Sequence, residues 1–322
     1  MNKKIAFVLM NYGGPQHIDE VEGYLKNIFK DPAILQAPFF IRLWLSYRIA
    51  KNRGQKSRDI FAKMGGKSPI NDETLKQVKA IEVEISHLNP QLSAKGFMIQ
   101  RYAKPFAKDV MGDIVAFNPD KIILLPMYPQ FSNTTTESSL KDFIKHAPKK
   151  LWKKIETLHY FYTDKGWQNY FINSIFNVFS QNKDTDFHVL YSAHSIPKFY
   201  VDKGDIYERQ VNDCVRIIHE QIEDKLGAAI PHCLAWQSKV GRMRWLAPSV
   251  EETIRSLNDT NMIVVPLSFV AENSETLVEL DMDMKDIAIA NGTQKYIRIP
   301  TPNADSGFIA DLAQHVVTLS QL

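Results

Sequence analysis

Short runs of β-favouring apolar residues alternate with stretches of helical periodicity along this 322-residue chain. This alternation constrains the fold most strongly, because it is typical of α/β proteins in which helices cover both faces of a parallel sheet. Eight runs are expected to be strands: Ile5–Met10, Phe97–Gln100, Lys121–Leu125, Ile155–His159, His188–Ser192, His232–Gln237, Met262–Leu267 and Tyr296–Ile299. The helices expected between them include Asp72–His87, Pro105–Phe117, Gly166–Gln181, Ile206–Asp224 and Ser274–Ala290.

The number of strands predicts two domains. About eight strands over this length fit two doubly wound parallel sheets better than one. We expect the domains at residues 1–155 and 156–303, because lysine pairs at 149–150 and 153–154 dilute the apolar pattern near that boundary. The chain after Ile5–Met10 and the chain after His188–Ser192 have a similar shape, which favours two related halves. In such sheets ligands bind beyond the carboxyl ends of the strands.

Composition excludes several classes of protein. Hydrophobic residues make up 44% and charged residues 23% of the chain, which is ordinary for a globular protein and excludes intrinsic disorder. A net charge of +3 gives no argument for a nucleic-acid partner. Two cysteines, Cys214 and Cys233, are too few for a disulfide scaffold or a four-cysteine cluster. Free thiols fit a reducing cytosol, so a cytoplasmic location is expected.

The segment Pro38–Ala50 is unusually apolar. Arg42 and Arg48 interrupt it, so it does not reach the roughly 18 uncharged apolar residues of a spanning helix. Its basic neighbours, Lys51 and Arg53, are compatible with a helix at a membrane interface or with the lip of an apolar pocket. A helix that faces the core is the other interpretation. The run Ile5–Met10 near the start is too short for a signal peptide.

His194 follows the expected strand His188–Ser192 almost directly. A histidine at the carboxyl end of a strand can accept a proton near pH 7 or bind a metal through a neutral nitrogen. Taken alone, such a histidine is more often a hydrogen-bonded structural residue.

Three acids follow each other at intervals of four residues: Glu275, Glu279 and Asp283. A helix that begins at Ser274 places all three on one face. Carboxylates stacked in this way repel one another, and they can pass a divalent cation or conduct protons. A solvated acidic face is the alternative, and the interleaved apolar residues are ordinary amphipathic patterning.

Aromatic and polar residues recur where the expected strands end. Flat rings with a few hydroxyls and cations can line a pocket for a large planar anion, although each ring singly also suits a core. The set includes Tyr12, Arg101, Tyr102, Tyr128, Trp236 and Trp245. Nucleotide motifs fail in contrast, since Gly66-Lys67-Ser68 lacks the first glycine of a P-loop.

Several segments, in order, are similar to those of the ferrochelatase family. The string Ser192-Ala193-His194-Ser195-Ile196-Pro197, continued by Asp202–Tyr207, resembles the family signature. The other matching segments are Asn11–Pro15, Gly65–Pro69, Tyr128–Ser132, Trp236–Gly241 with Trp245-Leu246, and Phe269–Asp281. They run from about residue 5 to 283, so the resemblance covers nearly the whole chain.

The resemblance implies an enzyme that inserts Fe²⁺ into a porphyrin at the end of haem synthesis. It also implies two Rossmann-like, chelatase-like domains with the active-site cleft between them, and a C-terminal helix at 304–322 that packs back on the first domain. His194 and Glu275 take the places of the catalytic pair. Glu279 and Asp283 take those of the acids leading away from the porphyrin, and all four are candidate iron contacts.

The resemblance assigns the remaining substrate contacts as well. Residues at the positions that line the porphyrin site are Tyr12, Arg53, Arg101, Tyr102, Tyr128 and Trp245. The two arginines suit propionates, because guanidinium groups pair well with carboxylates. The segment 38–50 takes the place of an apolar lip that meets the membrane in some members, so peripheral contact at the inner face of a membrane is expected. No tightly bound cofactor is expected, since Fe²⁺ is a substrate. No iron–sulfur cluster is expected, since the C-terminal cysteines that hold one in some members are absent.

Two positions depart from the common pattern. Asn273 stands where many members have a histidine two residues before the glutamate. Tyr12 is more typical of members that use coproporphyrin III, whereas Tyr128-Pro129-Gln130 and Gln237–Gly241 resemble those that use protoporphyrin IX. We weight the longer strings and expect protoporphyrin IX. The alternatives are coproporphyrin III, another metal such as cobalt, or a carrier that binds tetrapyrroles without catalysis.

Overall fold

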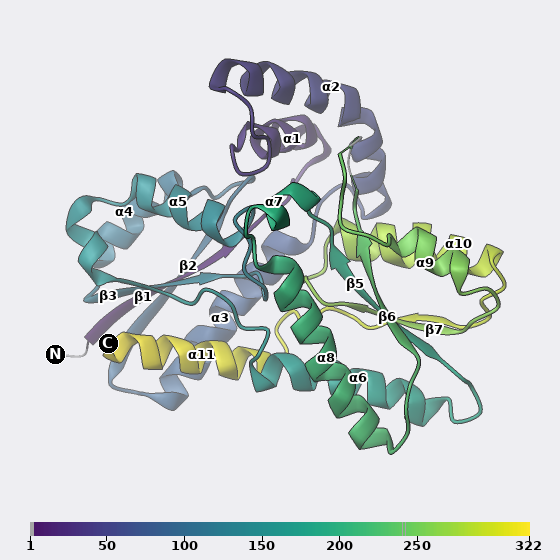
Figure 1. Cartoon of the computed structure of the whole chain (residues 1–322). Coiled ribbons are helices and arrows are strands. Elements are labelled where there is room, and N and C mark those ends of the chain that lie inside the picture. The colour runs from purple at the N-terminus through teal and green to yellow at the C-terminus, as the bar shows by residue number, and fades with distance from the viewer. Residues whose placement is uncertain (1–2, 240, 242) are drawn as a thin grey trace. The chain divides into compact units, whose positions relative to one another are not determined.

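The computed structural model describes residues 3–239, 241 and 243–322, and this part of the chain forms two compact units. Unit 1 contains the residues up to Tyr160 together with Phe308–Leu322, and unit 2 contains Phe161–Gly307. The described residues of each unit form one four-stranded parallel sheet flanked by helices (Figure 1). The expected α/β class with two parallel sheets is therefore confirmed. Val240, in the segment Trp236–Gly241, lies outside the described residues.

In unit 1 the first strand lies inside the sheet, whose order is β2-β1-β3-β4. The strands are β1 (Lys3–Asn11), β2 (Leu92–Gln100), β3 (Lys121–Pro126) and β4 (Ile155–Thr157). The helices are η1 (Ile18–Glu20), α1 (Val21–Lys30), α2 (Phe39–Lys63), α3 (Ile70–Leu88), α4 (Ala107–Phe117), α5 (Thr136–His146), η2 (Lys149–Lys154) and α11 (Ser306–Gln321). The last of these belongs to unit 1 although unit 2 precedes it in the chain.

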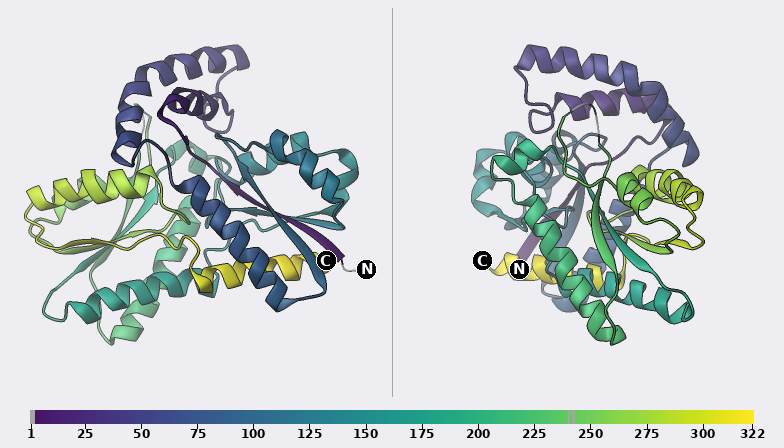
Figure 2. Two further views of the ribbon diagram at one scale, coloured as in Figure 1. Left: turned by 180° about the vertical axis from the view of Figure 1, so that it is seen from behind. Right: turned by 45° about the vertical axis from the view of Figure 1, so that its right-hand side comes forward.

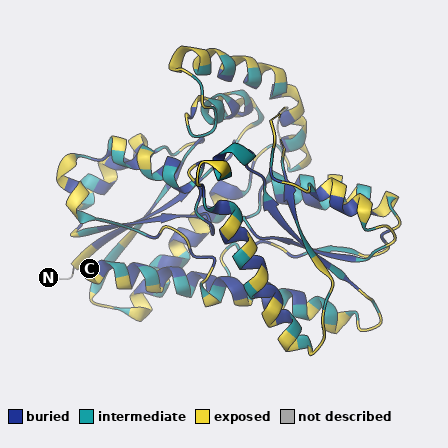
Figure 3. Ribbon diagram, in the orientation of Figure 1, coloured by how far each residue is buried: buried dark blue, intermediate teal, exposed yellow. Residues whose placement is uncertain are grey.

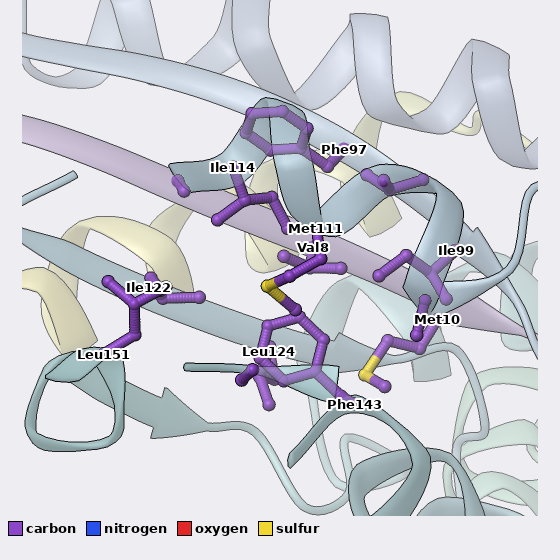
Figure 4. Packing of buried hydrophobic residues seen from close by; sticks show 14 residues of the cluster. Val8, Met10, Phe97, Ile99, Met111, Ile114, Ile122, Leu124, Phe143 and Leu151 are labelled. Carbon is purple, nitrogen blue, oxygen red and sulfur yellow. The ribbon is translucent and has the colours of Figure 1, made fainter. Parts of the chain in front are cut away.

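Both faces of β1 are buried, which is why its sequence is continuously apolar. On one face Val8 joins a cluster with Phe143 and other side chains of α4 and α5 (Figure 4). On the other face Phe7 lies near α3, because a Cβ on Gly96 would meet both the Phe7 ring and Val78 at about 2.5 Å. Helices therefore cover both faces of the sheet. Helix α11 lies beside α3 in each view (Figures 1 and 2).

Unit 2 repeats the arrangement with the order β6-β5-β7-β8. Its strands are β5 (His188–His194), β6 (His232–Gln237), β7 (Met262–Pro266) and β8 (Tyr296–Arg298). Its helices are α6 (Lys165–Gln181), α7 (Lys198–Asp202), α8 (Tyr207–Leu226), α9 (Val250–Ser256), η3 (Glu275–Met284) and α10 (Lys285–Ala290). Leu190 faces a core that includes Leu280 of η3, and Tyr191 on the opposite face contacts His219 of α8. In both sheets the first strand along the chain lies between the second and the third.

The helix expected at Ser274–Ala290 forms with an unexpected geometry. Its first ten residues, η3, are a π-helix, and only the last six residues, α10, are α-helical. A π-helix has hydrogen bonds from residue i to i+5, is rare, and is often found at functional sites. Helical periodicity in the sequence does not distinguish these two helix types.

The apolar segment 38–50 forms the first half of α2, and its apolar side chains face solvent. Phe40 is 80% exposed, and Trp44 is 58% exposed. The opposite face of α2 packs on α1 through a small cluster that includes Ala50 (Figure 3). The alternative of a core-facing helix is therefore wrong for these aromatic side chains. No helix among the described residues combines the length and the apolar character needed to cross a membrane.

Candidate active site

His194 is the last residue of β5, and two side chains hold its backbone. Its amide donates a hydrogen bond to Ser268 Oγ at 2.8 Å, and its carbonyl accepts one from the Tyr207 hydroxyl at 2.9 Å. The ring lies edge-on to Phe269, with centroids 6.5 Å apart. About a third of the side chain is exposed, while its Nδ1 atom is buried. The imidazole is therefore fixed in place and still accessible.

Glu275 is the acidic partner of His194. Its Oε1 lies 3.2 Å from His194 Nδ1, a close ion pair that is off the line of a well-directed hydrogen bond. Burial disfavours the imidazolium, but the charges of Glu275 and Glu279 outweigh it and raise the pKa of His194 above its usual value. The structure thus brings together the pair predicted from the sequence, and the histidine is a stronger base than a free imidazole.

Asn273 lies just before Ser274, the N-cap residue of the π-helix, and its side chain bonds to the backbone there. Its side-chain oxygen accepts a hydrogen bond from the Glu275 amide at 2.8 Å, and its side-chain nitrogen donates to the Ala271 carbonyl at 3.0 Å. The residue is buried, and its own amide donates to Thr276 Oγ1. Asparagine at this position therefore serves the local backbone and fixes where Glu275 begins the helix.

Glu279 is held by the loop that follows β6. Ser238 donates to it from its backbone amide, at 2.8 Å, and from its hydroxyl, and Gln237 Nε2 lies 3.4 Å away. Ser238 adopts a left-handed backbone conformation, with φ of 66°, that aims both donors at the carboxylate. Burial and the neighbouring Glu275 nevertheless raise the pKa of Glu279. This carboxyl group can accept a proton more readily than an ordinary glutamate.

The acids of η3 do not form a coordination sphere. Among the described residues, no group of three or more histidine, cysteine or acidic side chains is placed to hold one metal ion. Asp283, the last of the three acids predicted to form a row, is exposed. Between the acids of the row, Asp281 turns away and pairs with Arg298 through two contacts of 2.6 and 2.7 Å. Glu272 pairs with the same arginine at 3.0 Å. Transfer of protons or a cation along Glu275, Glu279 and Asp283 stays a prediction from the sequence.

In unit 1, three tyrosines gather beyond the ends of β1, β2 and β3. The Tyr12 ring lies edge-on to Tyr102, with centroids 4.9 Å apart, and to Tyr128, with centroids 5.9 Å apart. The chain passes below them through Gly13, whose φ is +75° and whose Cβ, if present, would lie 2.7 Å from that of Gln100. We call these three rings the tyrosine wall. That they line a pocket for a planar anion stays a prediction from the sequence.

Arg101, predicted to bind a propionate, is already paired. Its Nη2 lies 2.6 Å from Asp31, its Nε donates to Ser138 Oγ at 2.9 Å, and its Nη1 lies 3.7 Å from Asp142. The Tyr102 hydroxyl also donates to Asp31, at 2.8 Å. Asp31 was not identified from the sequence, where Asp31-Pro32 signals only a turn. Every nitrogen of the guanidinium therefore has a partner within the protein.

Arg53 is in the opposite situation. It lies in the second half of α2, is partly buried, and has no hydrogen bond or ion pair with any residue that the structure describes. Burial lowers the pKa of its guanidinium. An unpaired, partly desolvated cation is well suited to an anionic ligand. Trp245, the remaining predicted contact, belongs to unit 2, where it forms an isolated bridge with Pro197 just after the signature string.

The ferrochelatase family model matches residues 4–319. The ferrochelatase of Pelagibacter ubique is 36% identical over 317 residues, covering 98% of this chain and 91% of that protein. The ferrochelatase of Aquifex aeolicus is 36% identical over 318 residues, covering 96% of this chain and 97% of that protein. The chain belongs to the ferrochelatase family. The resemblance seen in the sequence motifs is thus confirmed over the whole chain, and the protein is an enzyme of that family.

Two solved structures share its fold at low sequence identity. CbiX, described as the terminal enzyme of sirohaem biosynthesis in denitrifying bacteria, is 13% identical with a TM-score of 0.54, over 98% of this chain and 99% of that one. SirB from Bacillus subtilis, solved with Fe³⁺, is 10% identical with a TM-score of 0.55, over 99% and 97%. These similarities support the chelatase-like fold of this ferrochelatase-family chain.

Proposed function

We propose that the protein inserts Fe²⁺ into protoporphyrin IX to form protohaem, with His194 and Glu275 as its catalytic pair. The observation that carries this proposal is the 3.2 Å contact between His194 Nδ1 and Glu275 at the end of β5. It joins an accessible imidazole of raised pKa to the first acid of the row on η3. General bases need such a pKa to work near neutral pH.

Proton balance assigns the roles. Fe²⁺ replaces two pyrrole hydrogens, so two protons leave the porphyrin for every iron that enters. His194 accepts these two protons one after the other, releasing the first before it takes the second, and Glu275 stabilises the imidazolium that results each time. Glu279, whose pKa is raised by burial, takes the proton next, and Asp283 passes it on. The same oxygen ligands suit a hard cation, so the row is also a candidate route for iron.

The tyrosine wall is proposed to hold the porphyrin ring. Aromatic rings favour flat apolar surfaces, and Tyr12, Tyr102 and Tyr128 are already fixed against each other. Arg53, as the unpaired cation, binds a propionate.

Anaerobic metal insertion followed by absorbance tests the proposal. Protoporphyrin IX and coproporphyrin III are offered in parallel with Fe²⁺ to the parent enzyme and to His194→Ala. We expect faster turnover of protoporphyrin IX and a loss of at least a hundredfold in the variant, as is typical when a general base is removed. A residual rate within about threefold of the parent contradicts the role of His194. If coproporphyrin III is turned over faster, the proposed catalytic pair stands and the proposed substrate is wrong. If the protein binds porphyrin but inserts no iron, it is a carrier.

We also propose that the apolar half of α2 contacts the inner face of the cytoplasmic membrane. Phe40 and Trp44 are exposed on it, and Arg48 lies 5.3 Å from the Trp44 ring, a pairing of aromatic and basic side chains typical of interfacial helices. Sedimentation with vesicles of phosphatidylglycerol and phosphatidylcholine tests this. Phe40→Ser should reduce binding severalfold, whereas Val83→Ser, which removes an exposed apolar side chain of α3, should not. Background binding by the parent protein contradicts the proposal.

A further inference from the structure

Asp31 is a buried carboxylate outside the catalytic row, and it lies under the tyrosine wall. Only 2% of its side chain is exposed. Its Oδ2 accepts hydrogen bonds from Arg101, Tyr102 and Ser138, and its Oδ1 accepts one from the Ala33 amide at 2.8 Å. Buried carboxylates cost free energy unless they are paired and hydrogen-bonded, and this one is fully satisfied.

The consequence for Arg101 is electrostatic. The guanidinium is 19% exposed and lies between two carboxylates, Asp31 at 2.6 Å and Asp142 at 3.7 Å. It also lies over the Tyr102 ring, 5.0 Å from the centroid. Burial opposes its charge, yet Tyr102, Asp31 and Asp142 raise the pKa of Arg101 above its usual value. The cation is therefore permanent, but its charge is compensated within the protein.

We propose that Asp31 is a positioning residue that sets substrate specificity by withholding Arg101 from the carboxylates of the porphyrin. With this charge compensated, the end of β2 presents aromatic surface and no net positive charge. Such a surface suits a porphyrin with two acidic side chains better than one with four, because extra carboxylates lose hydration without gaining a cation. The inference rests on the proposed function, since it concerns which porphyrin the same site accepts.

The test compares the kcat/KM ratio of coproporphyrin III to protoporphyrin IX among variants. Asp31→Asn removes the closer of the two carboxylates beside Arg101 while it keeps the shape of the side chain. The ratio should rise by about threefold to fivefold, the effect expected of one partly exposed cation meeting a carboxylate. Glu156→Gln is the matched control, because it removes a carboxylate from another ion pair of unit 1, with Lys121. It should leave the ratio unchanged.

The double variant Asp31→Asn with Arg101→Gln removes both charges. It can be tested even if the single variant Asp31→Asn does not fold. Our proposal expects its ratio to return to that of the parent. If the folded double variant loses more than tenfold in kcat/KM for protoporphyrin IX, Arg101 binds substrate directly and the proposal is overturned. An unchanged ratio in folded Asp31→Asn also overturns it. These outcomes are separate from the proposed function, which fails if the parent enzyme inserts iron into neither porphyrin.

Discussion

The first strands of the two sheets end in different kinds of side chain. In unit 1, β1 leads through Asn11 into Tyr12 and Gly13, and Arg101 at the end of β2 is paired with Asp31. In unit 2, β5 ends in His194, and its acidic neighbours raise its pKa. Both sheets have the same strand order, so topology determines where a site lies and not what it does. Unit 1 therefore presents an aromatic surface, and unit 2 presents the proposed catalytic pair.

The largest expected effect comes from the two cores. Ile114→Ala in α4 and Leu280→Ala in η3 each empty a fully buried position and should cost about 2–5 kcal/mol of stability. Only Leu280 lies on the helix that carries the acids, so kcat per folded molecule should fall for Leu280→Ala alone. Denaturant unfolding and active-site titration measure the two quantities. An equal loss of kcat in both variants contradicts the assignment of catalysis to unit 2.

Glu275→Gln tests the proposed catalytic pair of unit 2 directly. The amide keeps the shape but removes the charge that raises the pKa of His194, so kcat should fall by about a hundredfold. Since the neutral imidazole is the active base, the rising limb of the pH–rate profile should move to lower pH. Asp286→Asn, on the following helix α10, is the control. A profile that stays in place shows that Glu275 does not govern the histidine.

Gly13→Ala tests the turn beside the tyrosine wall of unit 1. The substitution places a Cβ 2.7 Å from that of Gln100 at a φ of +75°, so it should destabilise unit 1 by about 1–3 kcal/mol and raise KM for the porphyrin. Gly23→Ala in α1 is the matched control, because a Cβ there meets no atom within 4 Å and alanine favours the helix. Stability is read from thermal denaturation. If Gly13→Ala is as stable as the parent, the turn is not constrained as described.

The smallest expected effect concerns acid. His188 and His232 lie beside His219 at the amino ends of β5 and β6, where Glu223 and the Tyr191 hydroxyl also contact His219. Burial lowers the pKa of His188 and of His232 below the usual 6.5. The unfolded chain therefore binds protons more readily, and stability is complete above pH 6.5 and falls as the pH drops below it.

Hydrogen exchange, corrected for intrinsic rates, measures this difference between the units. The β5 and β6 amides should lose protection between pH 7 and pH 5 more than those of β1 and β3. His188→Gln should reduce this loss, whereas His87→Gln, at an exposed position of α3, should not. Equal losses in the two sheets indicate that the histidines do not couple acid to unit 2.

Much of this protein follows from local pattern. The eight expected strands all form, with ends shifted by a few residues, because continuous apolar runs between helices are specific to buried parallel strands. His194, Glu275 and Glu279 were candidates for the same reason, since strand ends and four-residue spacing are local properties. Their roles, and those of Arg53 and Trp245, came from the family resemblance.

Which charged side chains form ion pairs depends on the tertiary structure. Asp31 and Arg101 are 70 residues apart in the sequence, and no local pattern predicts that Arg101 Nη2 lies 2.6 Å from Asp31 Oδ2. The π-helix of η3 and the left-handed Ser238 that holds Glu279 also depend on packing between distant segments. Local patterns in the sequence were therefore enough to predict the fold class and the positions of the strands. Which charges are paired, and which remain for a ligand, depended on long-range contacts, because electrostatic energies are set by distance and burial in the folded chain.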